Sequence, residues 1–291
     1  MDRKDFIKSM SILMAGPIVS NAQPVLDELK KNEDTPRMPA FFIGHGNPMN
    51  ALFDNAFTKK LNTIRETFEK PKAILVVSAH WLTKGTYVST NPSPKTIYDF
   101  GGFPDELYKV KYEPKGSPEL ADQITKAINY TSVSQDQNMG LDHGAWTILK
   151  HIYPLADIPT FQLSIDYSKP PVFHYELAKQ LSYLRNKGVL IIGSGNIVHN
   201  LGMVDFKNPN NVYDWAREFD TTVKNLLDTG DDISLIHYEK LGKSAQLSIP
   251  TNDHYLPMLY ILGLKTKNEH ASTLFESLEM GSLSMRSFAI K

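Results

Sequence analysis

The sequence predicts an α/β fold with a mostly parallel central sheet that is covered by helices on both faces. Short, wholly apolar runs alternate along the chain with segments whose apolar residues recur every three or four positions. Strands that are apolar on both faces are typical of parallel sheets buried between helices. Three of these runs lead into histidines, and the carboxyl ends of parallel strands lie at one edge of a sheet, where ligands bind.

The first apolar run, residues 39–43, ends in a histidine flanked by two glycines. Gly44 and Gly46 allow the backbone to turn sharply where the strand stops, and they leave the ring of His45 uncrowded. Residues 53–68 follow with apolar side chains at helical spacing, which predicts an amphipathic helix.

A second strand and a long irregular loop come next. Residues 73–79 run straight into His80. Residues 81–116 show no regular period, and loops of this length in a compact domain are commonly functional. Three aromatic residues favour a pocket wall or lid, with a packed surface turn as the alternative: Tyr98, Phe100 and Phe103.

The remaining segments continue the alternation of strands and helices. Ser117 and Pro118 are a typical helix start, with a capping hydroxyl and a proline at the first helical position. Residues 189–193 form a strand that leads into the turn before His199. A phosphate-binding loop is not favoured there, because no Gly-Lys-Ser/Thr follows. The other expected elements are helices within 118–128, from 141 onward, within 173–184 and within 212–227, and a strand at 160–165.

Composition excludes several classes of site. The chain has 291 residues, 41% of them hydrophobic, enough for one large domain or two small ones. A net charge of -1 gives no electrostatic argument for nucleic acid or an anionic membrane surface. The absence of cysteine excludes disulfides, thiolate zinc sites, iron–sulfur clusters and cysteine nucleophiles. Any metal must therefore be held by imidazole and oxygen.

Four of the nine histidines are candidate metal ligands, and we expect one divalent metal per chain. They follow strands or precede a helix that Thr251 or Asn252 can cap, and they are His45, His80, His199 and His254. Four others occupy ordinary helix or loop contexts: His151, His174, His237 and His270.

His143 is a candidate acid/base rather than a ligand. It stands at the start of an expected helix, and the pKa of a histidine lies near neutrality. The preceding residue, Asp142, is expected to fix its tautomer or raise its basicity. A packing role for His143 is equally compatible with this context.

The N-terminal 37 residues read as an extension. A basic start, an apolar stretch at 10–19 and the small residues after it are typical of an export signal with a mature start near Gln23. The start resembles a twin-arginine signal, with Lys4 at the second arginine position. A frayed amphipathic extension is the alternative. The stretch is shorter than the roughly 20 apolar residues of a membrane span, and residues 23–37 read as a linker.

Seven motifs occur in a fixed order between residues 38 and 290, and together they resemble the 4,5-DOPA extradiol dioxygenase family. That family belongs to the class III extradiol ring-cleavage dioxygenases. The motifs are Phe-Ile-Gly-His-Gly-Asn-Pro-Met-Asn, Ser-Ala-His-Trp, Tyr-Asp-Phe-Gly-Gly-Phe-Pro, Leu-Asp-His-Gly-Ala-Trp, Gly-Ser-Gly-Asn-Ile-Val-His-Asn, Asp-His-Tyr-Leu-Pro and Glu-Met-Gly-Ser-Leu-Ser-Met.

The resemblance implies a single three-layer α/β domain over residues 38–291, with a central mostly parallel sheet flanked by helices. It implies that the four candidate ligands hold the metal and that His143 is the acid/base of the outer sphere. Many class III enzymes use two histidines and a carboxylate, and His254 stands at the position that resembles the carboxylate. We do not assign the adjacent Asp253 as a ligand.

The implied reaction opens a catechol, such as DOPA, with O2 to give a muconic semialdehyde. Activity would require Fe(2+), because Zn(2+), which imidazoles also bind, has no redox chemistry. A base must take a catechol proton, and either His143 or a metal-free His199 suits that role. The alternatives are a zinc hydrolase with a metal-bound hydroxide and a catalytically silent metal-binding module. The resemblance implies a cytoplasmic protein, whereas a working signal would place it in the periplasm; the sequence indicates no oligomeric state.

Overall fold

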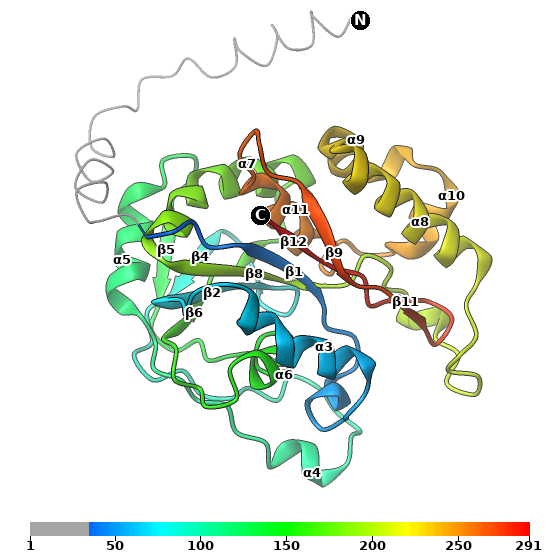
Figure 1. Cartoon of the computed structure of the whole chain (residues 1–291), viewed down its shortest axis with the longest axis horizontal. Helices are drawn as coiled ribbons and strands as arrows, with labels where there is room; N and C mark the ends of the chain where they lie inside the picture. The colour runs from blue at the N-terminus through cyan, green and yellow to red at the C-terminus, as the bar shows by residue number, and fades with distance from the viewer. Residues whose placement is uncertain (1–34) are drawn as a thin grey trace, which may run out of the picture.

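A mixed six-stranded sheet forms the centre of the computed structural model, which describes residues 35–291 (Figure 1). Four neighbouring strands are parallel, and the last two pair antiparallel at one edge. The predicted mostly parallel sheet is confirmed, while the two antiparallel strands carry no clear signal in the sequence. Across the sheet the strands are β6 (Thr160–Gln162), β2 (Ala73–Ser78), β8 (Val189–Gly195), β1 (Ala40–Gly44), β12 (Ser287–Ile290) and β9 (Ala271–Phe275).

Helices cover both faces of this sheet, which gives the expected three layers. Successive residues of β1 enter different cores: Phe42 packs in one and Phe41 in the other. The apolar character of every strand position follows from this burial on both faces. The first core includes residues of α7 (Pro171–Leu181), α8 (Asp214–Thr229) and α11 (Leu256–Gly263), and the second includes residues of α3 (Ala56–Ile64) and α6 (His143–Ile152).

Shorter elements surround these layers. Within the long loop expected at 81–116, two strands and a short helix break up the irregular backbone. The remaining α-helices are α4 (Asp105–Tyr108), α5 (Pro118–Ala127), α9 (Asp232–Ile236) and α10 (Lys243–Ser248). The two-stranded pairs are β3 (Leu82–Thr83) with β7 (Ile165–Asp166), β4 (Thr86–Ser89) with β5 (Val133–Asp136), and β10 (Leu278–Glu279) with β11 (Leu283–Ser284).

Local chemistry fixes where the helices begin. The Asn55 side chain accepts a hydrogen bond from Thr58 N at 2.9 Å at the start of α3, and the Asp142 side chain accepts one from Ala145 N at 3.1 Å at the start of α6. Pro118 begins α5 as predicted, although the hydroxyl before it makes no capping bond.

The chain is anchored to the domain earlier than the sequence predicts. Arg37, at the end of the expected linker, donates to Glu269 Oε1 at 3.2 Å and to Asn186 Oδ1 at 2.8 Å. The predicted export signal lies outside the described residues. Within residues 35–291, no helix is long and apolar enough to span a bilayer.

Next to Arg37, a buried ion pair joins the segment before β8 to the segment before β9. Arg185 is fully buried, and its guanidinium donates to both oxygens of Glu269, at 2.9 and 2.5 Å. Burial alone would raise the pKa of Glu269, but the hydrogen bond from Arg185 lowers it to about 2. The carboxylate therefore stays charged at neutral pH and compensates a cation that water cannot reach.

Glu269→Gln should destabilise the fold at pH 7 by about 3–5 kcal/mol, because it leaves the buried Arg185 guanidinium unpaired. A folded-state pKa below the usual 4.5 stabilises the protein above pH 4.5, so the difference from wild type should shrink as pH falls from 4.5 toward 2. Urea denaturation at several pH values measures both effects. Asp228→Asn is the control, because its pair with Lys224 is solvent-exposed and should contribute about 0–1 kcal/mol.

Candidate metal centre

Five histidines from separate elements line one cavity of about 330 Å³. His45 directly follows β1, His80 lies two residues beyond β2, and His199 lies in the turn after β8. His254 lies two residues before α11, and His143 is the first residue of α6. The structure therefore brings all five predicted residues together, and the three neighbouring strands β2, β8 and β1 explain why.

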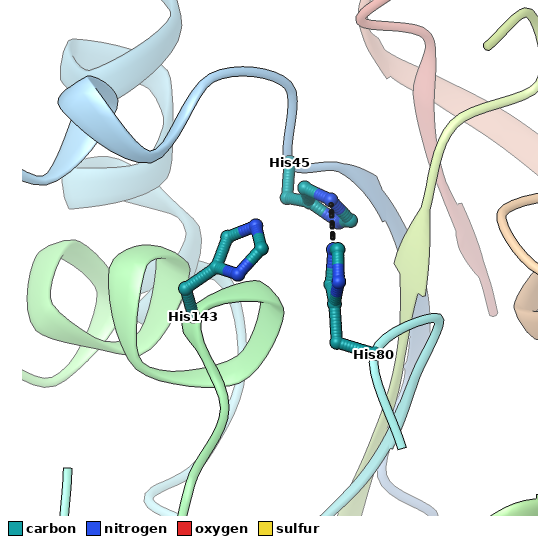
Figure 2. Close-up of side chains that lie close together, drawn as sticks. All are labelled: His45, His80 and His143. Atoms are coloured by element: carbon teal, nitrogen blue, oxygen red, sulfur yellow. Dashed lines mark hydrogen bonds between the residues drawn. The ribbon is translucent and has the colours of Figure 1, made fainter. Parts of the chain in front are cut away.

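Two imidazoles face each other through their Nε2 atoms, as Figure 2 shows. His45 Nε2 lies 3.1 Å from His80 Nε2, and the ring of His143 lies 3.8 Å from the ring of His80 between centroids. Each of the three offers a ligand nitrogen, and these nitrogens lie within 4.8 Å of one another. Gly46, with φ +61, provides the turn that carries the chain away from His45.

His199 and His254 form the other side of the cluster. Their rings stack face to face, with centroids 3.5 Å apart and planes inclined by 7°. The ring of His254 also lies 5.3 Å from that of His45 and 4.9 Å from that of His80. Gly195 allows the backbone of His254 to lie close to the end of β8, because a Cβ at residue 195 would lie 2.1 Å from the carbonyl oxygen of His254.

The hydrogen bonds around His45 fix its tautomer. Ser194 Oγ donates its proton to the carbonyl oxygen of Gly144 at 2.6 Å, since a carbonyl can only accept. In the 3.0 Å contact between Ser194 Oγ and His45 Nδ1, the ring nitrogen is therefore the donor. His45 Nε2 is left with its lone pair directed at His80, which is the form that binds a metal.

Asp99 is a site residue that the sequence analysis missed. Its Oδ2 lies 2.9 Å from His143 Nδ1 and 3.5 Å from His80 Nδ1, and its Oδ1 accepts from His143 N at 2.9 Å. Burial alone would raise the pKa of Asp99, but the hydrogen bonds from His143 leave it lowered. Its position between the aromatic residues of a loop already expected to line a pocket was the available signal.

The expectation that Asp142 fixes the tautomer of His143 is wrong. One oxygen of Asp142 accepts from Ser78 Oγ at 2.6 Å and from Ala145 N at 3.1 Å, so this carboxyl caps α6 instead. Burial raises its pKa to about 6. Asp99 holds Nδ1 of His143 in its place.

The cluster fits a divalent cation. Burial lowers the pKa of His45 and of His80 well below its ordinary value, and the neighbouring rings lower it further. Burial and then His254 lower the pKa of His199 to about 3. Neutral imidazoles are the form that binds metal ions. Two nitrogens bound tetrahedrally at about 2.0–2.1 Å lie roughly 3.3 Å apart, close to the observed 3.1 Å between His45 and His80.

Comparison with known proteins identifies the family. Residues 38–286 match the model of the catalytic LigB subunit of aromatic ring-opening dioxygenase. This chain belongs to that family. A protein of Escherichia coli K12 named 4,5-DOPA dioxygenase extradiol is 45% identical over 87% of this chain and 95% of its own length. One of the same name from Beta vulgaris is 39% identical over 85% and 94%.

A solved structure has a fold similar to that of this chain. The crystal structure of an uncharacterized protein from Escherichia coli K12 superposes with a TM-score of 0.77 at 41% identity, over 88% of this chain and 100% of that one. The chain is thus an extradiol ring-cleavage dioxygenase, as its motifs implied, and the hydrolase and silent-module alternatives are not favoured. An aromatic substrate and O2 follow from this class.

The aromatic loop lines the cavity, which confirms the predicted pocket wall. Phe100 and Phe103 lie in the lining, and Tyr98 packs behind them, 6.2 Å from Phe100 between ring centroids. The histidines expected in ordinary helix or loop contexts do not line this cavity: His151, His174, His237 and His270. Further apolar lining residues come from the segment after His199, from the β10–β11 turn and from β11: Leu201, Val204, Phe206, Met280 and Leu283.

Proposed function

We propose that this chain opens a catechol with O2 at a single Fe(II) bound by His45, His80 and His254. The observation that supports it is the pair of neutral imidazoles at the ends of the two strands that flank β8, one with a fixed tautomer, whose Nε2 atoms lie 3.1 Å apart inside a cavity. DOPA, which the similar proteins are named for, is the first catechol to test.

Ring stacking supports three ligands instead of the four that the sequence suggested. A metal bound to a histidine lies near the plane of its ring. Because the rings of His199 and His254 are nearly parallel and 3.5 Å apart, one ion cannot lie in both planes. His254 is the better ligand, since its Nδ1 donates to Asp253, and such a carboxylate partner orients metal-binding histidines.

Fe(II) is proposed because ring opening transfers electrons from a catechol to O2. Iron supplies this redox chemistry when bound, whereas zinc, which has no redox chemistry, would only polarise the substrate. The neutral ligands leave the charge of the cation uncompensated, which favours an anionic catecholate beside it.

His143 is placed to move the catechol proton. Its Nδ1 donates to Asp99, so its Nε2 is free to accept a proton and later return it. Asp99 stabilises the imidazolium that forms, because the two groups are then a charged pair at 2.9 Å. The side chain of His199, stacked on His254, is the second residue available for proton transfer.

Metal-free protein, reconstituted anaerobically with Fe(II) or Zn(II) and then mixed with DOPA in air, tests this proposal. We expect the Fe(II) form to consume O2 and form a yellow semialdehyde, and the zinc form to do neither, because only iron can exchange electrons with O2. Oxygen uptake and product absorbance are the measurements. Equal turnover by the zinc form would refute the redox argument.

A further inference from the structure

Apart from the histidines, Asn47 and Asp99, the residues that line the cavity are apolar or glycine. Six of these residues are here called the apolar wall: Phe100, Phe103, Leu201, Val204, Phe206 and Met280. Within residues 35–291, no lysine or arginine lines the cavity. Of its polar residues other than histidine, Asp99 is hydrogen-bonded to His143, and Asn47 Oδ1 accepts from Met49 N at 2.8 Å.

The apolar wall presents uncovered surface at the mouth of the cavity. Phe206 is 78% exposed and Leu201 is 63% exposed, although both also line the cavity. Exposed apolar side chains that adjoin a binding site favour an apolar ligand group that would cover them. The histidines line the same cavity, and Phe100 lies 5.5 Å from His143 between ring centroids, so a catechol bound beside the histidines would place its substituent against this wall.

Met280 is held in this wall by a strained backbone. Its φ of +50 lies in the left-handed region, which disfavours residues other than glycine, asparagine and aspartate. Its N–H donates to Pro209 O at 2.7 Å, and its carbonyl accepts from Asp205 N at 2.8 Å. These bonds fix the turn against the segment that carries Phe206. A strained residue at a cavity wall points to a functional constraint.

We propose that this wall is the subsite for the catechol substituent and that uncharged, apolar substituents are preferred to the zwitterionic side chain of DOPA. This inference rests on the proposed function. Each methylene group buried there should raise kcat/KM about fourfold. A carboxylate group would meet no lysine or arginine in the lining, and the one carboxylate that an ammonium group could meet, Asp99, is already hydrogen-bonded to His143, so DOPA should be the poorer substrate.

Steady-state O2 uptake by the Fe(II)-loaded protein tests the preference. The substrates are catechol, 4-methylcatechol, 4-propylcatechol, DOPA and 3,4-dihydroxyphenylpropionate. We expect kcat/KM to rise from catechol through 4-methylcatechol to 4-propylcatechol. The value for 4-propylcatechol should exceed the values for both charged substrates by at least about tenfold. A higher kcat/KM for either charged substrate than for 4-propylcatechol would overturn the subsite proposal and leave the proposed function standing. If none of the five substrates is opened, the proposed function is rejected instead.

Met280→Gly tests the contribution of the wall to substrate preference without destabilising the fold. Glycine adopts positive φ without strain, so the melting temperature should be unchanged or higher. The ratio of kcat/KM for 4-propylcatechol to that for catechol should fall about fivefold, because apolar contact is lost. Ala156→Gly is the matched control: Ala156 also has a positive φ, of +49, but it follows the opposite end of α6 from His143 and should leave the ratio unchanged. An unchanged ratio in Met280→Gly contradicts the proposal.

Phe206→Lys provides an independent test by reversing the chemistry of the wall. Phe206 is largely exposed, so the lysine should be tolerated. A cation there should raise kcat/KM for 3,4-dihydroxyphenylpropionate relative to 4-propylcatechol by about tenfold or more. If that ratio does not move, the substituent does not reach the wall and the proposal fails.

Discussion

A His45→Ala/His80→Ala double variant should contain no stoichiometric metal and should have no ring-opening activity. These two residues follow the strands that flank β8 on either side, and their Nε2 atoms lie 3.1 Å apart. Removing both leaves at most one of the three proposed ligands, which is too few for a site that must hold a cation against water.

Metal analysis of chelator-free protein, with O2 uptake on a catechol, measures this loss. His270→Ala is the control, because that histidine is exposed and belongs to none of the ligand groups found among residues 35–291. Its metal content should match wild type. Wild-type levels of metal in the double variant would show that the ion binds elsewhere.

His143→Gln should lower kcat by about 10²–10⁴-fold while metal content and catechol binding stay near normal. Glutamine retains a donor toward Asp99 but cannot accept and return a proton near neutral pH. Rapid kinetics under saturating catechol, together with metal analysis, separates proton transfer from metal binding.

The same experiment decides the alternative ligand set. His143 lies as close to His45 and His80 as a third ligand would, since the ligand nitrogens of the three are within 4.8 Å. A metal-depleted His143→Gln protein would assign it as that ligand in place of His254. Full activity with full metal would make it a packing residue and transfer the proton role to His199.

The sequence predicted the part of the site that follows from strand ends. Residues 39–43 and 73–79 are almost wholly apolar, which predicts parallel strands of one buried sheet. Each pairs with β8, and His45 and His80 therefore lie at the same edge of the sheet. The antiparallel strands β12 and β9 were not predicted, because strands this short do not show a distinctive period.

Hydrogen bonds between residues far apart along the chain could not be predicted from the sequence. Asp99 and His143 are 44 residues apart and meet only because the aromatic loop folds over α6. Asp142 was misassigned for the opposite reason: proximity in sequence suggested a contact with the ring, whereas an aspartate directly before a helix normally turns toward the backbone N–H groups of the first turn. The capping rule would have predicted its true role.

Asp99 and Phe100 are consecutive, and both contact the ring of His143, one through its carboxylate and the other edge-on at 5.5 Å between centroids. Phe100 also lines the cavity. A substituent too bulky for the cavity would push on Phe100 and, through the shared backbone, tilt the carboxylate that aligns the proton carrier. We therefore expect the size of the substituent to affect kcat as well as KM: a catechol that fits the cavity poorly would bind and still turn over slowly.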